Sequence, residues 1–266
     1  MTVLRRFLRD RRRAYLWWSL GMAAMVGLTV AFYPSIRGEA SFEELMEDLP
    51  EAVRALVGAE TGIAFTSPAG YLHSRMFASL VPILLLIFGI GLGARAIGGS
   101  EDDGTLEFLL ANPVTRRRVA LERAVGVVVL VLALTAFGAV ALFALGPTVD
   151  VLDGISAGRI GAAWSASAAL AMVHAALAFA VGAATGRRAP ALATATVVAV
   201  GGYLLEGLLA VTDTLGPLRV VSPWHWYLER NTLADGPTAT GVVAPVAVTV
   251  VLALVSAWRF ERRDLS

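Results

Sequence analysis

The side chains that could carry out chemistry are few and lie far apart in this chain. It has three histidines, His73, His174 and His225, and neither cysteine nor lysine among its 266 residues. A metal site needs several His, Cys, Asp or Glu ligands at workable spacing, and these histidines are too widely separated to supply one. The absence of cysteine removes disulfides, thiolate ligands and cysteine nucleophiles. We therefore expect no metal site and no catalytic residue.

The absence of lysine bears on nucleotide binding. A phosphate-binding loop of the form G-x-x-x-x-G-K-[ST] needs its lysine to reach the β and γ phosphates, so this chain cannot form one. The run "GIGLG", Gly89–Gly93, stands inside an apolar segment, and we interpret it as small residues for close helix packing, as we do the pair Gly182 and Gly186. Ser-His-Asp triads assemble in space, but no nucleophile motif occurs, and a membrane hydrolase is the least favoured class.

The most polar interior stretch is "SEDDGTLEFLLANPVTRRR", Ser100–Arg118. Its opening serine and acids are typical of a helix start, where free amide groups and the helix dipole favour them. We expect a short helix from about Gly104, ended by Pro113, and a second helix capped by Thr115. Leucines share one face of the first helix. It is therefore either a docking piece for a soluble partner or a helix that lies on lipid.

The elements around this stretch are those of a membrane protein. Hydrophobic residues make up 57% of the chain and its mean hydropathy is +0.69, above the apolar share of about 45–50% in soluble domains. Each of six apolar segments has close to the roughly 17–25 residues that cross a bilayer. The segments are Tyr15–Phe32, Phe77–Ile97, Val125–Leu145, Ile160–Ala184, Ala189–Val211 and Val242–Trp258. The sequence predicts an all-α membrane protein with six transmembrane helices.

The arginines predict the orientation. If both termini lie on one side, 16 of the 22 basic residues fall on that side and six on the other. The positive-inside rule makes the richer side cytoplasmic. We expect a multi-pass protein of the cell (cytoplasmic) membrane, with residues 98–124 as a cytoplasmic connection between the second and third spans.

Two outer loops carry patterns of their own. Residues 33–76 include "SFEELMEDLPEAVRALVG", an amphipathic helix with Ser41 and Glu44 as a capping box. This helix either covers the outer ends of the spans or acts as a substrate lid. Residues 212–241 include an aromatic group typical of an interface anchor, with an outer gate in a re-entrant segment as the alternative. The group is Pro223, Trp224, His225, Trp226 and Tyr227.

Two ionisable residues fall within predicted spans. His174 is near the middle of the fourth span and Glu206 is near the outer end of the fifth. Such residues often mark a pathway, so both are candidates for a translocation path. His174 could equally bond a neighbouring helix, and Glu206 could reach the interface. Two isolated ionisable groups are weak support for a proton relay.

The polar stretch resembles the cytoplasmic motif of the ABC-2 family of transporter permeases. In that motif an acidic residue precedes Gly-Thr-Leu-Glu, two leucines and Pro-x-x-Arg. The matching positions are Glu101, Gly104, Thr105, Leu106, Glu107, Leu109, Leu110, Pro113 and Arg116. The arginine-rich start, the spans and the basic tail extend the resemblance, which is to bacterial drug and antibiotic exporters. Arg123 stands where many relatives have lysine.

The resemblance implies a function. Residues 1–266 would form one transmembrane domain, in which 1–14 is a connecting helix at the membrane surface and 98–124 holds a coupling helix. That helix would dock in a separate ATP-binding subunit, through Glu107, Arg116 and the leucines, and ATP and Mg would be bound by that partner and by no site of this chain.

The family further implies export of a hydrophobic or amphipathic compound, such as a drug, an antibiotic or a lipid-like molecule. A second permease copy or a related permease would complete the path, in a homo- or heterodimer within the lipid bilayer. We expect no nucleic-acid partner. The alternative function is an ion- or proton-coupled secondary carrier or channel.

Overall fold

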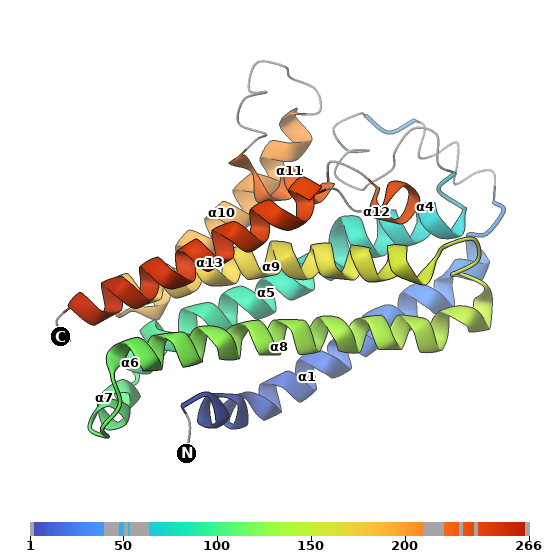
Figure 1. The fold of residues 1–266 in the computed structure, drawn as a ribbon. Helices are drawn as coiled ribbons and strands as arrows, with labels where there is room; N and C mark the ends of the chain where they lie inside the picture. The colour runs from blue at the N-terminus through green and yellow to red at the C-terminus, as the bar shows by residue number, and fades with distance from the viewer. Residues whose placement is uncertain are drawn as a thin grey trace.

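The computed structural model describes residues 3–39, 48–50, 53, 64–209, 221–228, 231–236 and 239–263. These residues form helices and contain no strand (Figure 1). Six helical stretches of the described residues are long and apolar enough to cross a membrane, which confirms the all-α fold with six candidate spans. They are Val3–Ser35, Pro68–Asp102, Arg116–Val149, Ala157–Thr185, Arg188–Leu208 and Gly241–Arg262.

The first three spans are built from several helical elements. The first combines α1 (Val3–Phe32) with η1 (Tyr33–Ser35), and the third combines α8 (Arg116–Leu145) with η4 (Gly146–Val149). The second contains two stretches of wider π-helix, and its elements are α4 (Pro68–Leu72), η2 (His73–Leu80), α5 (Val81–Ala94), η3 (Arg95–Gly99) and α6 (Ser100–Asp102).

The remaining elements are simpler. The last three spans are α9 (Ala157–Thr185), α10 (Arg188–Leu209) and α13 (Ala239–Arg262). Short helices stand at the two ends of the bundle: α7 (Thr105–Leu110) at one, and α11 (Pro223–Leu228) and α12 (Thr232–Asp235) at the other. The two ends of the chain lie at the same end of the bundle as α7 (Figure 1).

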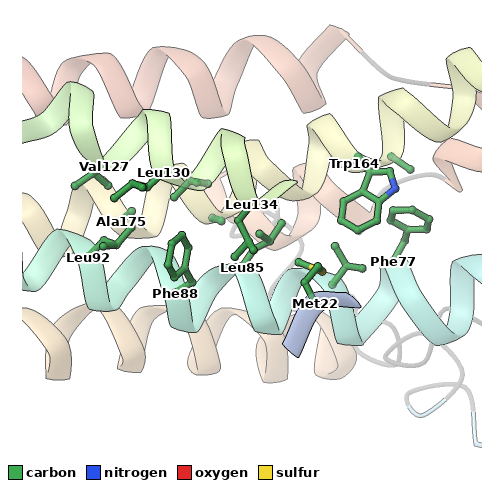
Figure 2. Close-up of a cluster of buried hydrophobic side chains, with 14 of the residues drawn as sticks. Met22, Phe77, Leu85, Phe88, Leu92, Val127, Leu130, Leu134, Trp164 and Ala175 are labelled. Carbon is green, nitrogen blue, oxygen red and sulfur yellow. The ribbon is translucent and has the colours of Figure 1, made fainter. Parts of the chain in front are cut away.

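The central helix of the bundle is α9, which packs against α5, α8, α10 and α13, while α1 packs mainly against α8. Alanines and glycines line much of α9, so neighbouring backbones can approach it closely. Larger side chains fill the space between α1, α5, α8 and α9 (Figure 2). The rings of Phe77 and Trp164 meet edge to face there, 5.6 Å apart.

The glycine-rich run of the second span provides close packing. A Cβ on Gly93 would clash with the carbonyl oxygen of Ala175 in α9, whereas one on Gly91 would meet no atom within 4 Å. Gly182 likewise packs against Gly98. These contacts confirm the packing interpretation. Gly186 has another role, because it ends α9 in the left-handed conformation with φ of 70°.

Side chains from other elements satisfy carbonyls in both π-helical stretches of the second span. The Tyr227 hydroxyl donates to the carbonyl of Phe77 in η2, and the Arg123 guanidinium donates to the carbonyl of Ala96 in η3. A π-helix displaces the usual backbone bonding. These two side chains therefore hold the second span where its geometry departs from the α-helix.

The structure differs from the sequence prediction at two helix boundaries. The sequence places Ser100, Glu101 and Asp102 at a helix start, but they form α6, the end of the second span. Partners described below offset the unfavourable helix dipole at that end. Residues 3–14, the expected connecting helix, are continuous with the first span in α1. The amphipathic helix predicted within 33–76 lies mostly outside the described residues.

Candidate functional site

The polar connection, which we define as residues 100–118, turns sharply between the second and third spans. Gly104 precedes α7 in the left-handed conformation, with φ of 65°, which favours glycine because it has no Cβ. The Thr105 hydroxyl donates to the carbonyl of Ser100 at 3.0 Å. At the far end, Thr115 accepts from the Arg118 amide at 3.3 Å, and this confirms it as the cap of α8. The turn is therefore fixed at both ends.

The end of α7 has a cap that the sequence analysis missed. The Asn112 side-chain amide donates to the carbonyls of Phe108 and Leu109, at 3.1 and 3.3 Å. Carbonyls at the end of a helix lack the usual helical partners, and the Leu109 carbonyl also accepts from the Asn112 backbone amide at 3.3 Å. Pro113 follows and is exposed. The sequence signal for this cap is an asparagine that follows a leucine-rich run and immediately precedes a proline.

Burial divides α7 into an inner and an outer face. Leu106 is fully buried and Leu109 is buried, whereas Phe108 is 77% exposed. Glu107 is also exposed, and Leu110 is intermediate. The sequence analysis expected the leucine face to meet a partner, but Leu106 and Leu109 pack into the core of this chain. The surface that α7 presents is formed by Phe108 and Glu107.

The acids of the connection bind the starts and ends of distant helices. Glu101 pairs with Arg263, just after α13. The Asp102 carboxylate accepts from the backbone amide of Arg188, at the start of α10, at 2.7 Å. Arg116 donates to the carbonyl of Arg263. Glu101 and Arg116, both predicted to belong to a docking motif, thus hold the connection against the rest of the bundle.

The aromatic group at the other end of the bundle is partly internal. Trp224 is 2% exposed, and its indole N–H donates to the carbonyl of Ala199 at 2.7 Å. The Tyr227 hydroxyl lies 2.8 Å from that of Ser167, and burial raises the pKa of Tyr227. Trp224 and Tyr227 thus join α11 to α10 and α9, and the anchor at the headgroup level stays a prediction.

The structure brings together two residues that the sequence analysis treated separately. The Nδ1 atom of His225 lies 3.0 Å from a carboxylate oxygen of Glu206. Pro223 begins α11, and Trp226 on the same short helix is partly buried. Glu206 therefore contacts α11. His174 is elsewhere, fully buried in α9, with its Nδ1 2.9 Å from the carbonyl of Leu170.

An apolar hollow lies beside this aromatic group. It has a volume of about 280 Å³ and is formed by α5, α10 and α11. Ile83, Ile87, Val200, Tyr203 and Trp224 are among its lining residues. Its wall offers little to a charged ligand and suits an apolar one.

Within the described residues, no group of three or more His, Cys, Asp or Glu side chains could hold a metal ion. The arrangement of the described residues is not that of a metal centre. It instead offers a fixed, partly exposed helix at one end and an apolar hollow near the other.

Six apolar helical stretches in the described residues, with α9 at the centre of their bundle, define a multi-pass membrane protein. Residues 1–265 match the family described as ABC-2 family transporter protein, and the chain belongs to this family. It is therefore a membrane subunit of an ABC transporter, and the family implies an ATP-binding partner. Comparison with curated proteins finds no match.

Proposed function

We propose that this chain is the permease of an ATP-driven exporter and that α7 is its coupling helix. The observation that carries the proposal is the exposed Phe108 on a helix whose other face is buried. Aromatic side chains, including Phe, are enriched at protein interfaces. Glu107 beside it would contribute a polar contact with the ATP-binding subunit.

The tethers of the connection support transmission of movement. Glu101, Asp102 and Arg116, which flank α7 in the polar connection, join this connection to the start of α10 and the end of α13. A push on α7 by a nucleotide-binding partner would therefore act on several spans together. ATP and Mg would be bound on that partner. Arginines are concentrated at the ends of the spans near α7 and both termini, which makes this the cytoplasmic side.

The apolar hollow formed by α5, α10 and α11 supports a hydrophobic or amphipathic cargo, such as a drug, an antibiotic or a lipid-like compound. Ile87, Val197, Val200 and Leu204 leave the adjoining faces of α5 and α10 exposed and apolar. A second permease, identical or related, would cover these faces and enclose the path. His225 and Glu206 would then stand near its outer mouth.

The docking proposal is tested by co-purification of the full chain from its own membranes. Phe108→Asp should reduce recovery of the ATP-binding subunit, by roughly thirtyfold in affinity if Phe108 contributes about 2 kcal/mol. Phe108→Leu, which keeps an apolar contact, is the matched control and should retain most of the partner. Both variants keep the buried leucines, so folding should be unaffected.

Two results would contradict the proposal. If Phe108→Asp recovers as much ATP-binding subunit as the wild type, α7 is not the docking element. If the folded wild-type chain recovers no nucleotide-binding partner at all, the result favours the alternative function, an ion- or proton-coupled carrier or channel. His174 and Glu206 then become the next residues to test.

A further inference from the structure

A polar cavity lies where three segments meet near α7. It has a volume of about 160 Å³ and is formed by the first turns of α1, the polar connection and the start of α8. Arg6, Arg11 and Arg123 are among its lining residues. Thr105 and Leu109 of α7 also line it, whereas Phe108 and Glu107 do not. The cavity is thus distinct from the surface proposed to bind the ATP-binding subunit.

The deepest of these arginines has no ion-pair partner among the described residues. Arg123 is 8% exposed. One of its N–H groups donates to the carbonyl of Ala96, and its buried Nε has no hydrogen-bond partner in the described part of the chain. None of the ion pairs among the described residues includes Arg123. A buried guanidinium in this condition is unfavourable unless something pairs with it.

The neighbouring positive charges make the unpaired guanidinium of Arg123 still less favourable. Arg11 and Arg6 both act electrostatically on Arg123, and Asp10 offsets them only in part. Arg11 is half-buried, its guanidinium lies over the Phe7 ring, and its Nε is buried without a hydrogen-bond partner in the same described residues. Like charges repel strongly where water is scarce. The inner part of the cavity therefore holds more positive charge than the chain itself neutralises there.

Two acids also line the cavity, but they lie at its rim. Asp10 is exposed and pairs with Arg6 at 4.0 Å. Asp103 is exposed as well. Neither forms an ion pair with Arg11 or Arg123. The acids thus leave the positive floor of the cavity available to an anion that enters past them.

We propose that this cavity binds the phosphate group of an anionic ligand between Arg11 and Arg123. The planar guanidinium matches the geometry of phosphate oxygens, and such charge-assisted bonds are strong. The phosphate could belong to an acidic lipid headgroup or be free in solution. Val3, Phe7 and Leu109 add apolar wall to the cavity. A bound phosphate would hold α1 against the connection that carries α7.

The test uses the full chain purified in neutral detergent and freed of bound lipid. Its thermal midpoint and its ligand retention in native mass spectrometry are followed with three probes: phosphatidylglycerol, phosphatidylcholine, and inorganic phosphate against chloride at equal ionic strength. Arg11→Gln should weaken binding about tenfold. Arg12→Gln removes the same charge from an exposed neighbour outside the cavity lining and should leave binding unchanged.

Arg11 is substituted in place of Arg123 because Arg123 also donates to the carbonyl of Ala96. Replacing Arg123 would therefore remove a contact of the fold as well as a charge of the cavity. Asp103→Asn gives an independent check with the opposite sign, since removing a negative charge at the rim should tighten binding. Stabilisation by phosphatidylglycerol alone identifies a lipid headgroup, and stabilisation by inorganic phosphate as well identifies a soluble anion. Both support the site.

The proposal is overturned if phosphatidylglycerol and phosphate affect the chain no more than phosphatidylcholine and chloride do. It is also overturned if Arg11→Gln and Arg12→Gln bind these probes equally well. The counter-charge for Arg123 would then have to come from another source, such as a carboxylate of the ATP-binding subunit.

Discussion

The guanidinium of Arg263 pairs with the carboxylate of Glu101, joining two residues that stand 162 positions apart in the chain. Their side chains are 20% and 10% exposed, so water screens the pair only partly. The pair connects the end of the second span to the end of the last. It also offsets the negative charge that Glu101 places at a helix C-terminus.

Arg263→Ala should therefore destabilise the chain through the carboxylate that it leaves behind. Breaking a fully buried ion pair costs about 3 kcal/mol or more, and the partial exposure of this pair makes about 2 kcal/mol the expected loss in free energy of unfolding. Unfolding of the purified chain in detergent measures it. ATP hydrolysis by the reconstituted complex should also become less dependent on cargo, because the polar connection that carries α7 has lost a tether.

The matched control is Arg262→Ala. Arg262 is the preceding residue and its guanidinium stacks on Trp258 at 4.4 Å, but no ion pair among the described residues includes it. Its replacement should change stability much less. Glu101→Gln combined with Arg263→Gln should recover part of the loss. Equal effects of Arg262→Ala and Arg263→Ala would mean that the pair with Glu101 does not stabilise the fold.

Local signals in the sequence predicted much of this structure. The six spans follow from apolar length alone, because a membrane span must satisfy its own backbone hydrogen bonds. Thr115 was identifiable as a cap because its hydroxyl oxygen accepts a hydrogen bond from an amide only three residues away. The positions of Gly104 and Pro113 likewise predicted where the connection breaks. Each of these features depends on neighbours within one or two helical turns.

Features that depend on distant neighbours were not predictable in the same way. The leucines of α7 form an apolar stripe whether they face a partner or the core, and only the packed bundle shows that Leu106 and Leu109 face inward. Trp224 and Tyr227 have the residue types of an interface anchor. Their burial depends on where Ala199 and Ser167 lie, and no sequence spacing records that position.

Gly93 should tolerate substitution far less well than Gly91. Gly93→Ala would place a Cβ against the Ala175 carbonyl, and the two helix backbones would have to separate. Overpacking of this kind costs about 1–3 kcal/mol. The identical change at Gly91 meets no atom within 4 Å and should be neutral or stabilise the helix by up to about 1 kcal/mol. Thermal unfolding of the two variants in detergent measures the difference, and similar midpoints would contradict the close approach of α5 and α9.

His174→Leu tests whether a buried histidine serves transport or packing. The change removes one bond to the Leu170 carbonyl, which costs about 1 kcal/mol, but it also removes an Nε2 atom that is buried without a partner among the described residues. The two effects oppose each other, so stability should change by less than about 1 kcal/mol. Because ATP hydrolysis on the partner would drive transport, the ATPase activity of the reconstituted complex should be retained.

The matching variant with the opposite expectation is His174→Asp. An ionised carboxylate at the centre of a span costs at least about 2.5 kcal/mol, so this chain should fold poorly. A different pattern would favour a proton-coupled carrier: His174→Leu folds to the wild-type level, and transport is lost. The histidine would then be required for its proton rather than for its volume, and Glu206, held by His225, would be the other group to substitute in the same assay.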